Sequence, residues 1–172
     1  MDGSIQVYYG NGRGKTTAAL GLGIRAAGVG KQVIMVQFLK KKHSDTLDFL
    51  KKLEPELQIF RFEKAACGYS DLSPKEKQEQ MLNIKNALGY SRKVLDTGQC
   101  DLLILDEIFG LVDYNIITIE ELMDLIAVKK DAMDWILTGR NLPDEVREIA
   151  DCVYSIQREK EKTPEILAQG NF

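Results

Sequence analysis

The sequence predicts an α/β fold, with an open, mainly parallel β-sheet and helices on both of its faces. Two observations lead to this prediction. Short apolar segments rich in β-branched residues alternate with longer segments of helical periodicity, which is the pattern of consecutive right-handed βαβ units. Several of the short segments are also apolar at nearly every position, as expected for strands that are covered on both faces.

Six short segments are expected to form the strands, and each is separated from the next by helix or turn signals. They are residues 4–9, 32–38, 57–62, 101–106, 133–138 and 152–156. Neither an internal repeat nor a boundary between two domains is visible. We therefore expect residues 1–172 to form a single domain, with a less regular, charged tail from about residue 158.

The first and last expected helices are recognised by residues that start or stop a helix. Residues 15–27 are rich in alanine and leucine, and Gly28 and Gly30 then provide stop signals. Proline favours the first turn of a helix, so Pro143 is expected to open a short helix that runs through Ala150.

Two further helices are predicted from capping boxes, in which a serine or threonine is followed three residues later by glutamate. Ser73 with Glu76 opens a long helix that is expected to end near residue 95. Thr118 with Glu121 repeats the pattern before a second apolar segment. Both helices fall between expected strands, as βαβ units require.

Composition excludes several classes of protein. The formal net charge of −3 argues against a nucleic-acid partner, because such proteins carry a surplus of lysine and arginine. The three cysteines are far apart, which favours reduced thiols over disulfides or a zinc site. We see no signal peptide, and no apolar run approaches the roughly 20 residues of a membrane span. We therefore expect a cytoplasmic protein with no membrane partner.

A glycine-rich loop, GNGRGKTT at residues 10–17, follows the first expected strand and precedes the first expected helix. It nearly matches the phosphate-binding P-loop G-x-x-x-x-G-K-[ST], but one residue is missing between its first glycine, Gly10, and Gly14. Gly10, Gly12 and Gly14 would let backbone N–H groups turn toward an anion, and the helix start adds its positive end. The sequence therefore predicts a P-loop NTPase-like fold.

The side chains of this loop suggest how a nucleotide would be bound. Lys15 would reach phosphate oxygens, and the hydroxyl of Thr16 would bind Mg²⁺. Asn11 and Arg13 project from the loop, and Thr17 follows in the first helical turn. We therefore assign the whole segment to nucleotide binding.

Other candidate residues stand at the ends of later strands. Asp106 and Glu107 close the segment LLILDE, where carboxylates beside a P-loop hold Mg²⁺ directly or through water. Arg140, in LTGR, and Arg25, on the first helix, could bind phosphate, although solvated arginines are the alternative. These residues predict a Mg²⁺-nucleotide-binding protein. They leave open whether the γ-phosphate is hydrolysed, transferred or untouched.

Five segments in one order resemble a known family. They are GNGRGKTTAA, the arginine at 25, GKQVIMVQFLK, LLILDE, and LTGR followed by EIADCVYSI. Over about residues 4–158 the chain resembles the P-loop type ATP:corrinoid adenosyltransferases, also called cob(I)yrinic acid a,c-diamide adenosyltransferases.

The resemblance implies transfer of the 5′-deoxyadenosyl group of ATP to the Co(I) of a reduced corrinoid, with release of triphosphate, in adenosylcobalamin synthesis or salvage. It implies ATP held in reversed orientation by residues 10–17, with Arg25 and Arg140 nearby. Thr16 and Glu107, beside Asp106, would ligate Mg²⁺. It further implies a flavoprotein reductant and a homodimer as partners.

The resemblance also implies a loop whose aromatic residues displace the lower axial ligand of the corrinoid. Here that loop reads GYSD, so Tyr69 keeps one aromatic position and Asp71 stands where tryptophan is expected. The catalytic residues implied are Lys15, Glu107 and Tyr69. Two alternatives stay open, namely another P-loop kinase or ATPase, and a non-catalytic protein that binds ATP or a corrinoid.

Overall fold

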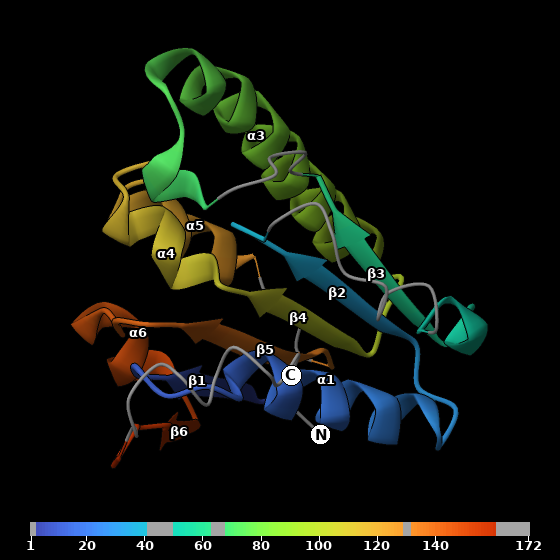
Figure 1. Cartoon of the computed structure of the whole chain (residues 1–172). Helices are drawn as coiled ribbons and strands as arrows, with labels where there is room; N and C mark the ends of the chain where they lie inside the picture. The colour runs from blue at the N-terminus through green and yellow to red at the C-terminus, as the bar shows by residue number, and fades with distance from the viewer. Residues whose placement is uncertain (1–2, 41–49, 63–67, 129–131, 161–172) are drawn as a thin grey trace.

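The computed structural model describes residues 3–40, 50–62, 68–128 and 132–160. Within them, six parallel strands form one sheet in the order β3-β2-β4-β5-β1-β6 (Figure 1). All six strands were predicted, and each end lies within one residue of its expected position. Their bounds are β1 Ile5–Tyr9, β2 Val33–Gln37, β3 Leu57–Arg61, β4 Leu102–Asp106, β5 Asp134–Gly139 and β6 Cys152–Ser155.

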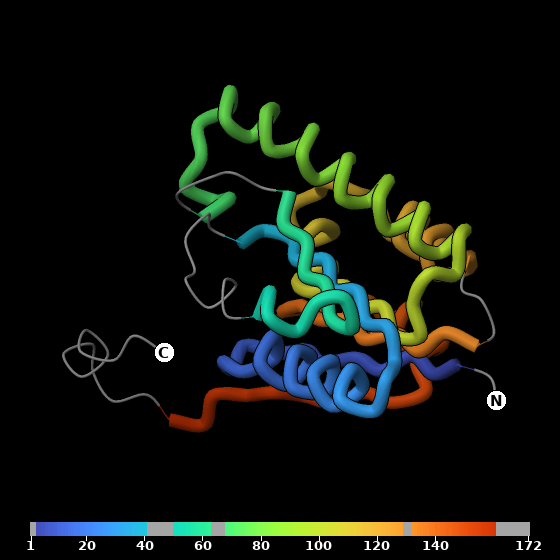
Figure 2. Tube along the Cα trace, turned by 90° about the vertical axis from the view of Figure 1, so that its right-hand side faces the viewer, coloured from blue at the N-terminus to red at the C-terminus, as the bar shows by residue number. Residues whose placement is uncertain are grey.

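Helices cover both faces of this sheet, as the sequence predicted. Helix α1 (Lys15–Ala27) packs on one face through Ala19, against apolar residues of β2, β3, β4 and β5. Among the described α-helices, four contribute apolar residues to the opposite face. They are α3 (Pro74–Thr97), α4 (Ile108–Asp113), α5 (Ile119–Ala127) and α6 (Asp144–Ile149). Figure 2 shows the long helix α3 on the other side of the sheet from α1.

Both predicted capping boxes are confirmed. The side chain of Ser73 accepts a hydrogen bond from the backbone N–H of Glu76, and the Glu76 carboxylate accepts one from the N–H of Ser73. Thr118 and Glu121 exchange the same two bonds. Helix α3 continues two residues past the expected end and stops at Gly98, whose φ of 62° is in the left-handed region.

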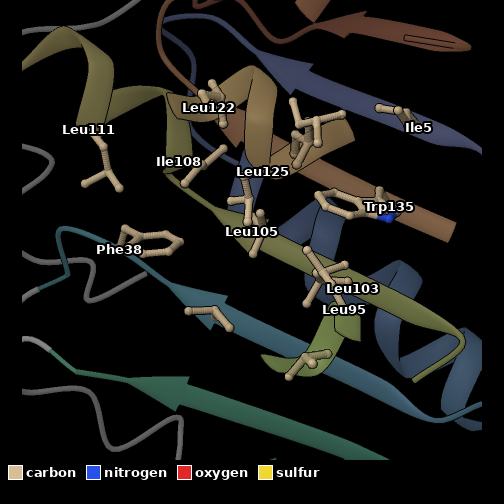
Figure 3. Packing of buried hydrophobic residues seen from close by; sticks show 14 of the residues in the cluster. Ile5, Phe38, Leu95, Leu103, Leu105, Ile108, Leu111, Leu122, Leu125 and Trp135 are labelled. Atoms are coloured by element: carbon tan, nitrogen blue, oxygen red, sulfur yellow. The ribbon is translucent and has the colours of Figure 1, made fainter. Parts of the chain in front are cut away.

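The core consists of alternating strand residues that point to opposite faces of the sheet. On β4, Leu103 and Leu105 point toward α3, α4 and α5, whereas Ile104 points toward α1. Figure 3 shows the larger cluster, in which Trp135 of β5 and Phe38 after β2 are fully buried. The sheet is therefore covered on both faces, which explains its nearly continuous apolar strands.

The carboxyl ends of the strands meet at one edge of the sheet. Gln37, the last residue of β2, lies in register with Arg61 of β3 on one side and with Asp106 of β4 on the other. Beside β4, strand β5 ends at Gly139, which pairs with Tyr9 at the end of β1. Because ligands of open α/β sheets bind beyond these ends, this edge is the place to look for a site.

Several short elements of the fold were not predicted. Helix α4 starts directly after Glu107, which adopts a left-handed φ of 65° and so turns the chain sharply after β4. A short 3-10 helix, η1 (Lys51–Leu53), precedes β3. Among the residues that the structure describes, none of the helices is both long and apolar enough to cross a membrane.

Candidate nucleotide-binding site

The glycine-rich loop is tied to the sheet by two of its own N–H groups. Gly10 donates to the carbonyl of Arg140 (3.0 Å), and Gly12 donates to the carbonyl of Ile156 (2.9 Å). Because protein carbonyls already accept the hydrogen bonds of these two N–H groups, other N–H groups of the loop would have to face an anion. The role of the Gly10 and Gly12 N–H groups is to fix the loop between the ends of β5 and β6.

The loop approaches the chain after β6 so closely that side chains are excluded. A Cβ atom on Gly10 would overlap the carbonyl of Ile156, and one on Gly12 would lie 2.8 Å from the same oxygen. Gly10 also has a φ of 120°, which L-residues with a side chain rarely adopt. The sheet therefore requires glycine at both positions.

The start of α1 supplies the N–H groups that can face an anion. Gly14 is the N-cap residue, and the first bond within the helix runs from the N–H of Ala18 to the carbonyl of Gly14. The N–H groups of Lys15, Thr16 and Thr17 precede this bond, so α1 itself offers them no carbonyl. They lie at the positive end of a 13-residue helix, which favours a bound phosphate.

The ammonium of Lys15 lies over the loop. Its Nζ donates to the carbonyls of Gly10 (2.7 Å) and Gly12 (2.9 Å). Burial lowers the pKa of Lys15, and the charges of Lys40 and Arg140 lower it further, whereas Glu107 and Asp106 act in the opposite direction. Lys15 therefore shares the cavity with two further cationic side chains, Lys40 and Arg140, whose charges a bound polyanion would neutralise.

Asp106 is the centre of a buried polar cluster at the end of β4. Its carboxylate is completely buried and accepts hydrogen bonds from Thr16 Oγ1 (3.0 and 3.1 Å), Gln37 Nε2 (3.0 Å) and Thr138 Oγ1 (2.7 Å). Thr138 in turn accepts a bond from the N–H of Glu107 (2.8 Å). The cluster therefore joins the P-loop helix to strands β2, β4 and β5.

Sequence reasoning assigned no role to Gln37, Thr138 or Arg61. Arg61 Nε donates to Gln37 Oε1 (2.7 Å), which fixes the amide so that its nitrogen faces Asp106. Each of these residues lies at or near the carboxyl end of a strand. That position was the available signal, but a polar residue at a strand end is common and does not by itself indicate a partner.

A cavity of about 690 Å³ opens above the loop. It brings together most of the predicted site residues, including the entire glycine-rich loop, and adds Lys40. Its lining is Gly10, Asn11, Gly12, Arg13, Gly14, Lys15, Thr16, Thr17, Lys40, Glu107 and Arg140. The lining carries four basic side chains and one acidic one, so the cavity suits a polyanion.

Three predicted site residues lie outside this lining, namely Asp106, which is buried beneath it, Arg25 and Tyr69. Arg25 is exposed in the last turn of α1, nine positions beyond Thr16 and so roughly 13 Å farther along the helix axis. Tyr69 belongs to the 3-10 helix η2 (Tyr69–Asp71), where its ring packs on Tyr114 at 5.1 Å between centroids. Lys77 Nζ lies 5.8 Å from the same ring, and the expected position of tryptophan is held by exposed Asp71.

The oxygen atoms of the site suit Mg²⁺. This ion binds proteins through one or two carboxylates and completes its shell with water and phosphate oxygens. Thr16 Oγ1, Asp106 and Glu107 provide such oxygens next to the cavity. No cluster of three or more His, Cys, Asp or Glu side chains that could hold a metal occurs in the described ranges. A cation here would thus depend on phosphate oxygens for its remaining ligands.

Gly10→Ala is expected to abolish most nucleotide binding, because the added methyl group displaces the loop from the carbonyl of Ile156. Gly21→Ala in α1 is the matched control, since a Cβ there meets no atom within 4 Å and alanine favours the helix by up to about 1 kcal/mol. Isothermal titration with ATP would measure both variants. Equal ATP affinity in Gly10→Ala and the wild type would show that the loop tolerates this shift.

Comparison with known proteins finds related sequences that cover most of the chain. The sequence model of a family described as ATP:corrinoid adenosyltransferase BtuR/CobO/CobP matches residues 1–169. A corrinoid adenosyltransferase of Escherichia coli is 30% identical over 155 residues, which cover 90% of this chain and 76% of that protein. The corrinoid adenosyltransferase CobA of Salmonella typhimurium gives the same identity and coverage.

Similarity among solved structures supports the fold. A KaiC-like protein of Pyrococcus horikoshii superposes with a TM-score of 0.59 and covers 93% of this chain and 74% of its own. Its sequence identity of 19% restricts this comparison to the architecture. The predicted P-loop NTPase-like fold is thereby confirmed.

Proposed function

The chain belongs to the family of ATP:corrinoid adenosyltransferases, and on this basis we propose that it transfers the 5′-deoxyadenosyl group of ATP to the Co(I) centre of a reduced corrinoid. The electron pair of Co(I) forms the new bond to C5′. The bond between C5′ and the α-phosphate oxygen breaks, and its electrons leave with inorganic triphosphate. Because cobalt supplies the nucleophile, the protein contributes orientation and charge neutralisation.

The basic cavity above the shortened loop is the observation that carries this proposal. Lys15, Arg13 and Arg140 surround the space in which a triphosphate would lie, together with the N–H groups at the start of α1. These groups can stabilise the negative charge that triphosphate gains as it leaves. The loop thus binds the leaving group, and the ribose carbon is the reacting atom.

The hydrogen bonds of Asp106 hold the carboxyl ends of β2, β4 and β5 together beside the proposed triphosphate site. Asp106 orients the hydroxyl of Thr16, and Glu107 faces the same cavity. We assign Mg²⁺ to Thr16 and Glu107. When bound, the ion neutralises part of the triphosphate charge.

We assign Tyr69 to the corrinoid because the resemblance to the family implies this role, and the place of its ring outside the phosphate cavity, against Tyr114, is compatible with it. Tyr69→Ala is expected to lower turnover by at least tenfold while ATP affinity changes less than twofold. Steady-state rates and ATP titrations would separate the two quantities. Tyr69→Phe, which keeps the ring, should retain most turnover, and an equal loss of rate and ATP affinity in Tyr69→Ala would place the residue at the nucleotide.

The phosphate product tests the proposed reaction. The protein would be incubated with MgATP and a corrinoid under strong reduction, and ³¹P NMR would follow the phosphates. We expect triphosphate in proportion to the adenosylated corrinoid. ADP with orthophosphate would indicate a kinase or ATPase, and ATP binding without any product would indicate a non-catalytic binding protein.

A further inference from the structure

Lys40 is the last residue of the segment GKQVIMVQFLK, but it was not among the predicted site residues. It follows β2 by three residues, and its Nζ lies 3.0 Å from Thr16 Oγ1 and 3.3 Å from Asp106 Oδ2. The Lys40 side chain is 26% exposed, whereas Asp106 is completely buried. The ammonium therefore neutralises the buried carboxylate from the cavity side.

This position is incompatible with simple addition of a divalent cation. The Thr16 hydroxyl donates its proton to Asp106 and accepts a hydrogen bond from Lys40, which leaves one lone pair. Magnesium bonded to that oxygen would lie about 2.1 Å from it, and hence within a few ångströms of the ammonium. Two cations so close repel each other strongly in a partly buried site.

The ammonium of Lys40 can occupy a second position in the cavity. Its Nζ is carried on a flexible four-carbon chain, and Lys40 lines the same cavity as Lys15, Arg13 and Arg140. A small rotation of this chain moves the ammonium away from Asp106 and toward a triphosphate in the cavity. The positive charge that Lys40 withdraws from Asp106 is then replaced by that of the divalent cation.

We propose that Lys40 is an exchangeable counter-cation, which neutralises the Thr16–Asp106 pair before nucleotide binds and moves to the triphosphate when a divalent cation takes its place. This inference rests on the proposed function, because it uses the same cation and triphosphate sites. It makes Lys40 a binding residue for the leaving group. It also means that the protein suppresses binding of the cation without nucleotide.

Lys40→Met tests this proposal, because methionine keeps much of the side-chain volume and removes the charge. Electron paramagnetic resonance would measure the affinity for Mn²⁺ alone, and calorimetry would measure the affinity for inorganic triphosphate at saturating Mg²⁺. We expect Mn²⁺ to bind at least tenfold more tightly and triphosphate at least tenfold more weakly. A role that only supports the fold would not shift the two affinities in opposite directions.

Lys31→Met is the matched control, since Lys31 pairs with Asp134 at 3.0 Å at the opposite end of β5 and should leave both affinities unchanged. Lys40→Gln provides a second neutral variant, and near-ultraviolet circular dichroism verifies the fold of each. Unchanged or weaker Mn²⁺ binding, or unchanged triphosphate binding, in the folded neutral variants would overturn the proposal. Because no corrinoid is present, failure of adenosyl transfer would not affect this result.

Discussion

Lys15→Ala is expected to lower the rate of adenosyl transfer by about 100- to 1,000-fold, which is typical for loss of one donor that stabilises charge in a transition state. The ammonium of Lys15 lies within reach of the loop and contacts the carbonyls of Gly10 and Gly12. With triphosphate in the cavity, the same ammonium would neutralise the leaving group. Rates measured at saturating ATP and corrinoid would show the loss.

The fold of Lys15→Ala should stay intact, because the side chain faces the cavity and belongs to neither apolar cluster. Lys31→Ala serves as the control, since it removes a lysine from an exposed ion pair and should leave the rate unchanged. A thermal unfolding curve would be recorded for both variants. Unfolding of Lys15→Ala where the wild type is folded, or an unchanged rate, would contradict the assigned role.

Asp106→Ala is expected to lower the free energy of unfolding by about 3–5 kcal/mol, which is typical for removing one partner of a buried charge pair. The substitution leaves Gln37, Thr138 and Lys40 without the carboxylate that they contact. It also releases the hydroxyl of Thr16, so the affinity for MgATP should fall at least tenfold. Urea unfolding and calorimetry would measure the two effects.

Asp144→Ala is the matched control for Asp106→Ala. Its carboxylate is 94% exposed and lies 3.9 Å from Arg147 Nε, so the loss should be below about 1 kcal/mol. Comparable losses in the two variants would mean that the cluster around Asp106 adds little to stability. An Asp106→Ala protein that binds MgATP as tightly as the wild type would remove Asp106 from the nucleotide site.

The strands and capped helices could be predicted because their signals are local. The β4 segment is apolar at every position up to Asp106, and Ser73 lies three residues before the glutamate that completes its capping box. The contacts of Gln37 with Asp106 and Arg61 could not be predicted. They join residues 69 and 24 positions apart, and they depend on the register of three strands.

The sequence predicted which residues line the candidate site better than it predicted the contacts between them. The glycine-rich loop, Glu107 and Arg140 line one cavity, as their places after strand ends suggested. The sequence could not show which backbone N–H groups are free to face an anion, because the carbonyls that bind the N–H groups of Gly10 and Gly12 belong to the distant residues Arg140 and Ile156. Helix α4 was missed because it begins one residue after a positive φ at Glu107, with no capping residue to mark it.

The destination of the ribose C5′ atom tests the proposed function most directly. ATP labelled with ¹³C at C5′ would be incubated with the protein and a reduced corrinoid, and ¹³C NMR would be recorded on the purified corrinoid in the dark. We predict that the label is bonded to cobalt, in an amount equal to the triphosphate released. Label that stays in ADP, with an unmodified corrinoid, would contradict adenosyl transfer.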